Sequence, residues 1–140
     1  MTATKLDYSS LEKAINTLET AINSFESRKA LMETEERDLM RDGVIQRFEY
    51  TFELAWKTIK RYLEMYGLEK VDNLSNRDLF RLGFENGLIK DASPWFDYLA
   101  DRSQTTHIYD QDVAADVFAS AEKFLIDVQY LLDQLKERVR

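Results

Sequence analysis

Apolar side chains recur every three or four residues along three stretches of the chain, which is the period of an amphipathic α-helix. The first stretch predicts a helix over about 7–30, and the second predicts a longer helix over about 37–66 that ends at Gly67. The third predicts a helix that starts after Asp110, a residue suited to an N-cap. The polar stretch KALMETEERD predicts a connection between the first two. The apolar positions of the stripes are Tyr8, Leu11, Ile15, Leu18, Ile22 and Phe25; Val44, Ile45, Phe48, Phe52, Ala55, Trp56, Ile59, Tyr62, Leu63 and Tyr66; and Val113, Val117, Ala121, Phe124, Val128, Leu131 and Leu135.

Capping residues predict two shorter helices between the second and third long ones. Ser75 precedes Asp78 by three residues, an arrangement that resembles a capping box, and Asn86-Gly87 follows as an end signal. Ser93-Pro94 combines an N-cap with a proline in the first turn, and this second short helix runs into Arg102. Brief connections, with no repeat and no linker, predict a single-domain antiparallel helical bundle over residues 1–140.

The long second helix is unusual on the side away from its main apolar stripe. That side carries Arg47, Tyr50, Leu54, Arg61 and Met65 in place of a run of plain charges. Such a mixed face predicts partial burial on both sides. Either another helix of the same fold or a second copy of the chain covers it.

Composition agrees with an all-helical protein and limits its partners. Hydrophobic residues make up 44% of the 140 positions and charged residues 32%, with a single proline and no cysteine. No window of about 18 apolar residues predicts a membrane span, and the first ten residues lack the apolar region of a signal peptide, so we expect a cytoplasmic protein. The formal net charge of −7 weakens general affinity for nucleic acid but leaves room for a local basic site.

The stretch DRSQTTHIYD, residues 101–110, holds the only histidine of the chain, His107. Arg102 lies five residues earlier, so on one straight helix the two side chains would point about 140° apart at ~100° per residue. Thr105 and its β-branched neighbours lower the helix propensity there, which predicts that the helix loosens before His107. Either the turn then brings Arg102 and His107 to one side, or two chains supply them across a two-fold axis. A structural histidine at a helix end is the alternative.

Arginine and histidine together suit the chemistry of phosphodiesters. A guanidinium clamps phosphate oxygens and stabilises the charge that develops on them. An imidazole takes or gives a proton near neutral pH. RNA carries its own nucleophile, the 2′-hydroxyl, so these two residue types suffice without a metal or another cofactor. The sequence has no glycine-rich phosphate loop, nucleophile elbow or metal-binding motif.

Other polar residues have simpler interpretations. We interpret Arg47, Glu49 and Tyr50 as an internal ion pair beside a packed ring, with a phosphate contact in a dimer cleft as the alternative for Arg47. Glu53 and Lys57 are four apart and predict an ordinary exposed helix pair. The two tryptophans, at positions 56 and 95, are interpreted as core residues.

Two blocks of the sequence, DGVIQRFEYTFELAWKTIKRYLE and FENGLIKDASPWFDYLADRSQTTHIYD, resemble the nucleotidyltransferase substrate-binding protein family of the HEPN superfamily. The resemblance covers roughly residues 5–138, and Arg102, His107 and Tyr109 match the motif R-x4-H-x-Y. It implies an up-and-down four-helix bundle with extra short helices, usually a homodimer. It also implies a partner, a small nucleotidyltransferase encoded nearby.

Within this superfamily, the HepT-like toxins of the HEPN/MNT toxin–antitoxin type are metal-independent ribonucleases whose R-x4-H pairs meet at the dimer cleft. By this resemblance Arg102 holds the scissile phosphate of RNA and His107 is the general acid or base. Tyr109 is the residue to which the partner transferase adds AMP. Family members commonly carry Asn after the arginine, where this chain has Ser103, which keeps a hydroxyl but lacks the amide. Ser103 and Arg47 are further candidate contacts of the cleft or phosphate.

The resemblance is compatible with a second function. Members of the family were first interpreted as non-catalytic subunits that present a substrate to a two-component nucleotidyltransferase. A purely structural dimeric bundle is a third interpretation, which leaves the R-x4-H-x-Y motif unused.

Overall fold

The computed structural model describes residues 5–67 and 70–139, and within them all regular structure is helical. The predicted all-α class is confirmed. Five α-helices and one 3₁₀ helix follow one another along the described residues. They are α1 (Ser9–Arg28), α2 (Thr34–Tyr66), α3 (Asn76–Glu85), α4 (Ser93–Arg102), the 3₁₀ helix η1 (Thr105–His107) and α5 (Gln111–Arg138).

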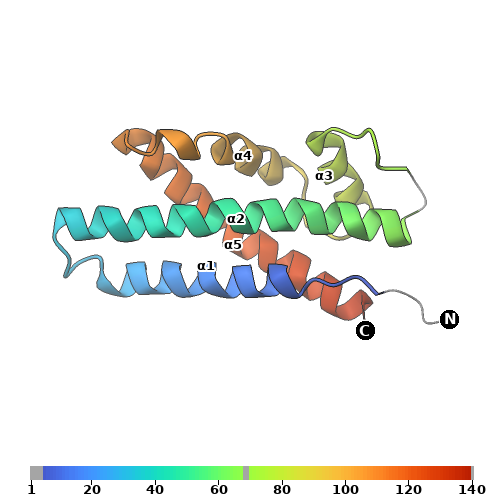
Figure 1. Cartoon of the computed structure of the whole chain (residues 1–140), viewed down its shortest axis with the longest axis horizontal. Coiled ribbons are helices and arrows are strands. Elements are labelled where there is room, and N and C mark those ends of the chain that lie inside the picture. Colours follow the sequence, from blue (N-terminus) through green and yellow to red (C-terminus); the bar gives the residue numbers. More distant parts are fainter. Residues whose placement is uncertain (1–4, 68–69, 140) are drawn as a thin grey trace.

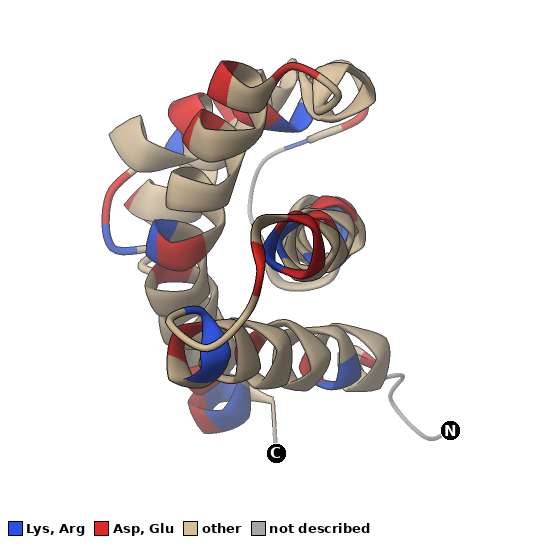
Figure 2. Cartoon of the chain, turned by 90° about the vertical axis from the view of Figure 1, so that its left-hand side faces the viewer, with Lys and Arg blue, Asp and Glu red and all other residues tan. Residues whose placement is uncertain are grey.

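Helices α1, α2, α4 and α5 form an antiparallel up-and-down four-helix bundle, and α3 and η1 are its additional short helices (Figure 1). In Figure 1, α1 and α2 run in opposite directions side by side, α3 and α4 lie along the opposite side of α2, and α5 crosses behind. The end view in Figure 2 shows α2 surrounded on three sides, by α1, α5 and the layer of α3 and α4. Contacts of α5 with α1, α2 and α4 close the bundle.

Aromatic rings fill the centre of the bundle and fix α4 in place. Phe52, Phe80, Trp95 and Phe124 are fully buried and come from α2, α3, α4 and α5. The Trp95 ring meets Phe124 edge-on, with ring centroids 5.5 Å apart. Burying each such side chain contributes roughly 1.5–3 kcal/mol, and edge-to-face pairs add to this. The interpretation of Trp95 as a core residue is confirmed, and its packing holds α4, the helix that ends at Arg102, against the core.

The predicted caps and boundaries agree with the structure at most positions. The side chain of Ser75 accepts the backbone N–H of Asp78, and the carboxylate of Asp110 accepts two N–H groups of the first turn of α5. Two boundaries differ. Helix α2 begins at Thr34 instead of about residue 37, because its exposed first turn carries acidic residues that suit a helix N-terminus but show no apolar period. Helix α4 is capped at Ala92, so Ser93 is its first residue.

The mixed face of α2 is partly covered by α1. The Tyr50 hydroxyl shares a hydrogen bond with the Thr17 hydroxyl of α1, while Leu54 and Met65 are half-buried against the core. Arg61 is exposed. One of the two predicted covers, another helix of the same fold, therefore accounts for part of this face. Within residues 5–67 and 70–139, none of the helices combines the length and the apolar character that crossing a membrane requires.

Candidate functional site

The R-x4-H-x-Y motif lies on one surface segment that joins α4 to α5. Helix α4 ends at Arg102, and the chain tightens into η1, as the β-branched residues predicted. The Thr105 side chain is buried and its hydroxyl donates to the Arg102 carbonyl at 3.0 Å. The His107 N–H then donates to the Gln104 carbonyl at 2.9 Å, and the Asp110 N–H donates to the His107 carbonyl at 3.0 Å. Successive turns, and not one straight helix, therefore carry the motif.

The Arg102 side chain is held by a carboxylate of α2. Its Nε donates to Oε1 of Glu53 at 3.1 Å, and the indole N–H of Trp56 donates to Oε2 of the same carboxylate at 3.1 Å. The side chains of Arg102 and Glu53 are 32% and 34% exposed. Within the described residues, the two Nη groups of Arg102 make no hydrogen bond. Glu53 thus orients the guanidinium through one nitrogen and leaves its other edge available to a ligand.

His107 and Tyr109 stand side by side in solvent. Both residues are exposed, and Tyr109 is 80% exposed. The Tyr109 hydroxyl lies 3.5 Å from Nδ1 of His107, at the outer limit of a hydrogen bond, and the two rings are nearly perpendicular with centroids 6.0 Å apart. Any group attached to the Tyr109 oxygen would therefore lie beside the imidazole.

No hydrogen bond joins the side chains of Arg102 and His107 within one chain. Arg102 is the last residue of α4 and its Nε donates to Glu53, whereas His107 ends η1 with Tyr109 beside it. Ser103 lies next to Arg102 and is exposed, and its hydroxyl donates back to the Ala100 carbonyl. The segment therefore collects Arg102, Ser103, His107 and Tyr109 on one surface without joining the arginine to the histidine.

Arg47 lies elsewhere on α2. At ~100° per residue it is about 120° around the helix from Glu53, and its Nη1 donates to the Gly43 carbonyl at 3.0 Å. It forms no ion pair within the described residues, so the predicted ion pair with Glu49 is not formed. Arg47 lines a cavity of about 490 Å³ between α1 and α2, together with Asn16, Thr17, Thr20, Ala21, Ser24, Met40 and Gly43. Within one chain the structure does not bring Arg47 to Arg102.

Sequence reasoning missed Glu53 and Trp56 as members of the site. The expected pair of Glu53 with Lys57 is wrong, because the carboxylate turns to Arg102 and Trp56 instead. The Lys57 ammonium lies 5.8 Å from the centroid of the Trp56 ring. Trp56 is half-buried at this edge of the core. The only local signal was the spacing of Glu53 and Trp56, one helical turn apart.

The other side of α4 is acidic. A cavity of about 390 Å³ between α4 and α5 is lined by Asp97, Asp101 and Asp116, with Lys123 at its edge. The Ser120 hydroxyl donates to the Asp101 carboxylate. Within residues 5–67 and 70–139, no three histidine, aspartate or glutamate side chains gather as metal ligands would. The site that bears the motif is thus confined to the opposite edge of α4 and to η1.

Comparison with known proteins identifies the family of the chain. The family model described as "Nucleotidyltransferase substrate binding protein like" matches residues 6–137. A Haemophilus influenzae protein called "Probable ribonuclease HepT" is 32% identical over 146 residues, which covers 99% of this chain and 97% of the relative.

Two solved structures share the fold. A Haemophilus influenzae structure, described as showing the fold of a substrate binding domain of a nucleotidyltransferase, superposes with a TM-score of 0.87 at 31% identity and covers 93% of this chain and 99% of its own. A crystal structure of a Thermus thermophilus protein has a TM-score of 0.70 at 32% identity and covers 89% and 98%. The chain therefore belongs to the family of nucleotidyltransferase substrate binding proteins.

Proposed function

We propose that the protein is a metal-independent ribonuclease toxin of the HEPN type, or a subunit derived from one, controlled by a small partner nucleotidyltransferase. The observation that supports this most is the composition of one surface segment. An oriented guanidinium, an exposed imidazole and an exposed tyrosine hydroxyl lie within eight residues of one another. The name of the Haemophilus influenzae relative is consistent with the proposal.

The proposed reaction is a transesterification within RNA. The 2′-oxygen attacks the adjacent phosphorus and loses its proton to a general base, while the 5′-oxygen leaves and gains a proton. A 2′,3′-cyclic phosphate and a 5′-hydroxyl result. His107 is the proton donor or acceptor, and the free Nη edge of Arg102 stabilises the negative charge on the phosphoryl oxygens. Ser103, adjacent to Arg102, offers a further hydroxyl to the phosphate.

We further propose that two copies of the chain build one cleft. Because Arg102 is hydrogen-bonded to Glu53 and not to His107 within one chain, a two-fold dimer that brings the arginine of one copy to the histidine of the other completes the site. Arg47, on a different side of α2, is then a candidate contact at the rim of that cleft. The partner transferase adds AMP to Tyr109, and the nucleotide blocks His107, since the tyrosine hydroxyl lies 3.5 Å from the imidazole.

Growth and RNA cleavage test the ribonuclease directly. Expression of the chain without its partner should arrest growth, and the purified protein should cleave RNA in the presence of a metal chelator. The variant His107→Ala should abolish both effects, whereas Lys13→Gln, on the exposed side of α1, should abolish neither. A wild-type protein that leaves both growth and purified RNA unchanged excludes the ribonuclease function.

Mass measurement tests the modification. Incubation with the neighbouring transferase and ATP should add mass in steps of one AMP unit and stop RNA cleavage. Tyr109→Phe removes the acceptor oxygen but keeps the ring, so it should remain unmodified and active. Mass steps that persist in Tyr109→Phe would exclude Tyr109 as the acceptor.

A non-catalytic substrate-binding subunit is the second candidate. The description of the Haemophilus influenzae structure favours it, since it names a substrate binding domain of a nucleotidyltransferase. In that case the partner's transfer to a third molecule should require this chain, and His107→Ala should leave that transfer intact.

A further inference from the structure

Two arginines of α3 lie over one aromatic ring of α4. The guanidinium carbon of Arg77 lies 4.9 Å from the centroid of the Phe96 ring, and that of Arg81 lies 5.4 Å from it. Both arginines are exposed, and they are four residues apart on the same helix. Like charges at this spacing destabilise a helix, so the arrangement calls for a compensating anion. Within the described residues Asp78 pairs with Arg81 at 3.1 Å, and no carboxylate lies within ion-pair distance of Arg77.

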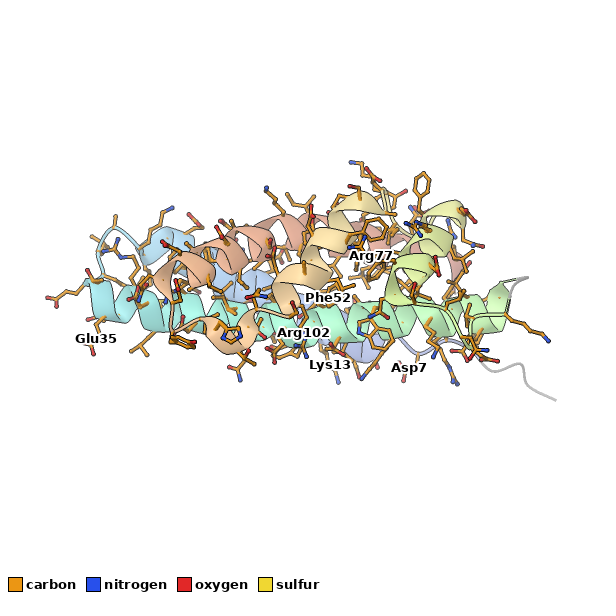
Figure 3. The ribbon with its side chains drawn as sticks, turned by 90° about the horizontal axis from the view of Figure 1, so that it is seen from above. Asp7, Lys13, Glu35, Phe52, Arg77 and Arg102 are labelled. Carbon is orange, nitrogen blue, oxygen red and sulfur yellow. The ribbon has the colours of Figure 1, made fainter. Side chains whose placement is uncertain are left out.

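Phe96, the ring beneath this arginine pair, precedes Arg102 by six residues, which is about 9 Å along α4 and about 120° around it. At ~100° per residue, Phe96 and Arg102 both lie at least about 100° around the helix from the acidic positions Asp97 and Asp101. Figure 3 looks onto the side that bears α3 and α4, and it labels both Arg77 and Arg102 there. On α2, the Trp56 ring carries the Lys57 ammonium on its face, and its N–H reaches the carboxylate that holds Arg102. We call Arg77, Arg81, Phe96, Trp56 and Lys57 the aromatic–cationic track.

Charge limits the direction in which a polyanion can leave the site. The side of α4 that faces α5 presents Asp97 and Asp101 with Asp116, and these carboxylates repel phosphate. The edge towards α3 presents guanidinium groups instead. Both guanidinium groups lie over the Phe96 ring; within the described residues that of Arg77 forms no ion pair, whereas Arg81 shares Nη1 with Asp78 and keeps its other nitrogens for a phosphate. Cations interleaved with aromatic rings are the surface on which single-stranded nucleic acids bind.

We infer that the aromatic–cationic track binds the single-stranded RNA on one side of the scissile phosphate, so that the strand runs from Arg102 along α4 to Arg77 and Arg81. The inference rests on the proposed ribonuclease function and deepens it by assigning the path of the substrate. The track gives an acidic protein a local site for RNA.

Binding measurements with a matched control test the track. The probe is a fluorescent single-stranded RNA of about 12 nucleotides, and all proteins carry His107→Ala so that the probe survives. Arg77→Gln with Arg81→Gln should weaken RNA binding about tenfold. It should also reduce the slope of log affinity against log salt by about 1.4, since each lost phosphate contact contributes about 0.7 for a single strand. The control, Lys13→Gln with Lys29→Gln, removes the same charge from two exposed positions, one on α1 and one directly after it, and should change affinity less than twofold.

The outcomes separate the track from the ribonuclease. Equal weakening in both double variants, or an unchanged salt slope in the arginine variant, overturns the track. If the protein with His107 intact cleaves RNA while the arginine variant keeps the wild-type KM, the track is wrong and the proposed function stands. If the arginine variant loses RNA binding but the wild-type protein cleaves no RNA, the ribonuclease is wrong, and the track is an RNA-binding surface without a scissile phosphate at Arg102. The double variant Arg77→Lys with Arg81→Lys keeps both positive charges but lacks the planar guanidinium groups, so it should weaken RNA binding about threefold. It replaces the double glutamine variant if the glutamine variant fails to fold.

Discussion

At the scale of single residues, the Glu53 carboxylate accepts hydrogen bonds from two side chains. Glu53 accepts a hydrogen bond from Arg102 with one oxygen and from Trp56 with the other. The indole belongs to the half-buried edge of the core, so it fixes the carboxylate, and the carboxylate in turn fixes the guanidinium. Because both ionic side chains are about one-third exposed, this pair contributes little to stability. Its main effect is the orientation that it gives to Arg102.

Substitution of Glu53 should therefore change activity more than stability. Glu53→Ala should lower kcat for RNA cleavage about tenfold, because the guanidinium loses its fixed direction, while the free energy of unfolding falls by no more than about 1 kcal/mol. Glu53→Gln keeps one acceptor oxygen and should recover part of the lost rate. Steady-state kinetics and denaturant unfolding of both variants measure the two effects. A Glu53→Ala protein with wild-type kcat would show that Arg102 needs no positioning.

A buried tyrosine predicts loss of stability at alkaline pH. Burial raises the pKa of Tyr98 above its ordinary value of about 10, and the hydrogen bond to Asp127 and its charge raise it further. The folded protein thus keeps the Tyr98 proton at a pH where the unfolded chain releases it. The stabilisation is complete below pH ~10 and decreases by up to about 1.4 kcal/mol per pH unit above it. Tyr98→Phe removes this ionisation, so its unfolding free energy should fall less steeply above pH 10 than that of the wild type. Parallel slopes would contradict the assignment.

The sequence predicted the members of the site that lie close together along the chain. Arg102, His107 and Tyr109 share one segment, and β-branched residues indicated the break between the first two. Glu53 could not be predicted as a member of the site, because it lies 49 residues from Arg102 in the sequence and its contact depends on how α4 packs on α2. The spacing rule for Glu53 and Lys57 describes an isolated helix, and here a tertiary partner displaced that pair.

At the scale of elements, the last turn of α5 holds the connection between α3 and α4. Arg138 donates from Nη1 to the Asn86 carbonyl at 2.6 Å and from Nη2 to the Gly87 carbonyl at 3.1 Å. Gly87 has a φ of 75°, which a side chain would strain, and a Cβ there would lie 2.8 Å from the arginine. The guanidinium satisfies carbonyls at the end of α3 that have no partner within their own helix. The C-terminal turn therefore fixes the start of the layer that carries Phe96 and Arg102.

Loss of this clamp should reduce stability at a distance from the site. Arg138→Ala should lower the free energy of unfolding by about 1–2 kcal/mol, since it removes two charge-assisted hydrogen bonds at a partly solvated position. Glu137→Ala, at the neighbouring exposed residue, is the control and should change it by less than about 0.5 kcal/mol. Thermal or denaturant unfolding compares the two variants. Equal effects would show that Arg138 is not a clamp.

The number and type of the helices could be predicted because the spacing of the apolar residues and the capping residues indicated the same helices. Ser75 and Asp110 marked helix starts by side chains that accept N–H groups, a local interaction that needs no tertiary knowledge. The early start of α2 at Thr34 was missed, because an exposed first turn without apolar residues resembles a loop. The mixed face of α2 indicated partial burial, but the choice between α1 and a second copy depends on packing that periodicity does not encode.

At the scale of the whole molecule, the arginine and the histidine of the motif have separate partners within one chain. Arg102 is turned towards α2, whereas His107 stands beside Tyr109 in η1 and the turn that follows. The net charge of −7 gives RNA no general attraction to the surface. On the proposed function, the ribonuclease therefore requires a second copy of the chain to complete the pair and local cations to bind the RNA strand.

A mixture of inactive proteins tests the composite site. Arg102→Ala and His107→Ala should each be inactive as pure dimers. In an equimolar mixture with free exchange of subunits, half of the dimers are mixed, and each contains one intact site out of two. RNA cleavage should therefore recover to about one quarter of the wild-type rate. No recovery, with exchange confirmed by mass measurement, would show that each site uses residues of a single chain.

The short distance between Tyr109 and His107 has a consequence for the number of antitoxin molecules that a cell needs. On the proposed function, a transferase that reaches the tyrosine hydroxyl has to cover the imidazole 3.5 Å away while it does so. The transferase therefore inhibits the toxin in two ways. While bound, it covers the site reversibly, which requires one transferase per site. After it dissociates, the AMP that it attached to Tyr109 continues to block the site. One antitoxin molecule can dissociate from a toxin that carries AMP and then modify another toxin molecule. A cell could then hold many toxin molecules silent with few copies of the antitoxin, and removal of the antitoxin would leave only newly made toxin active.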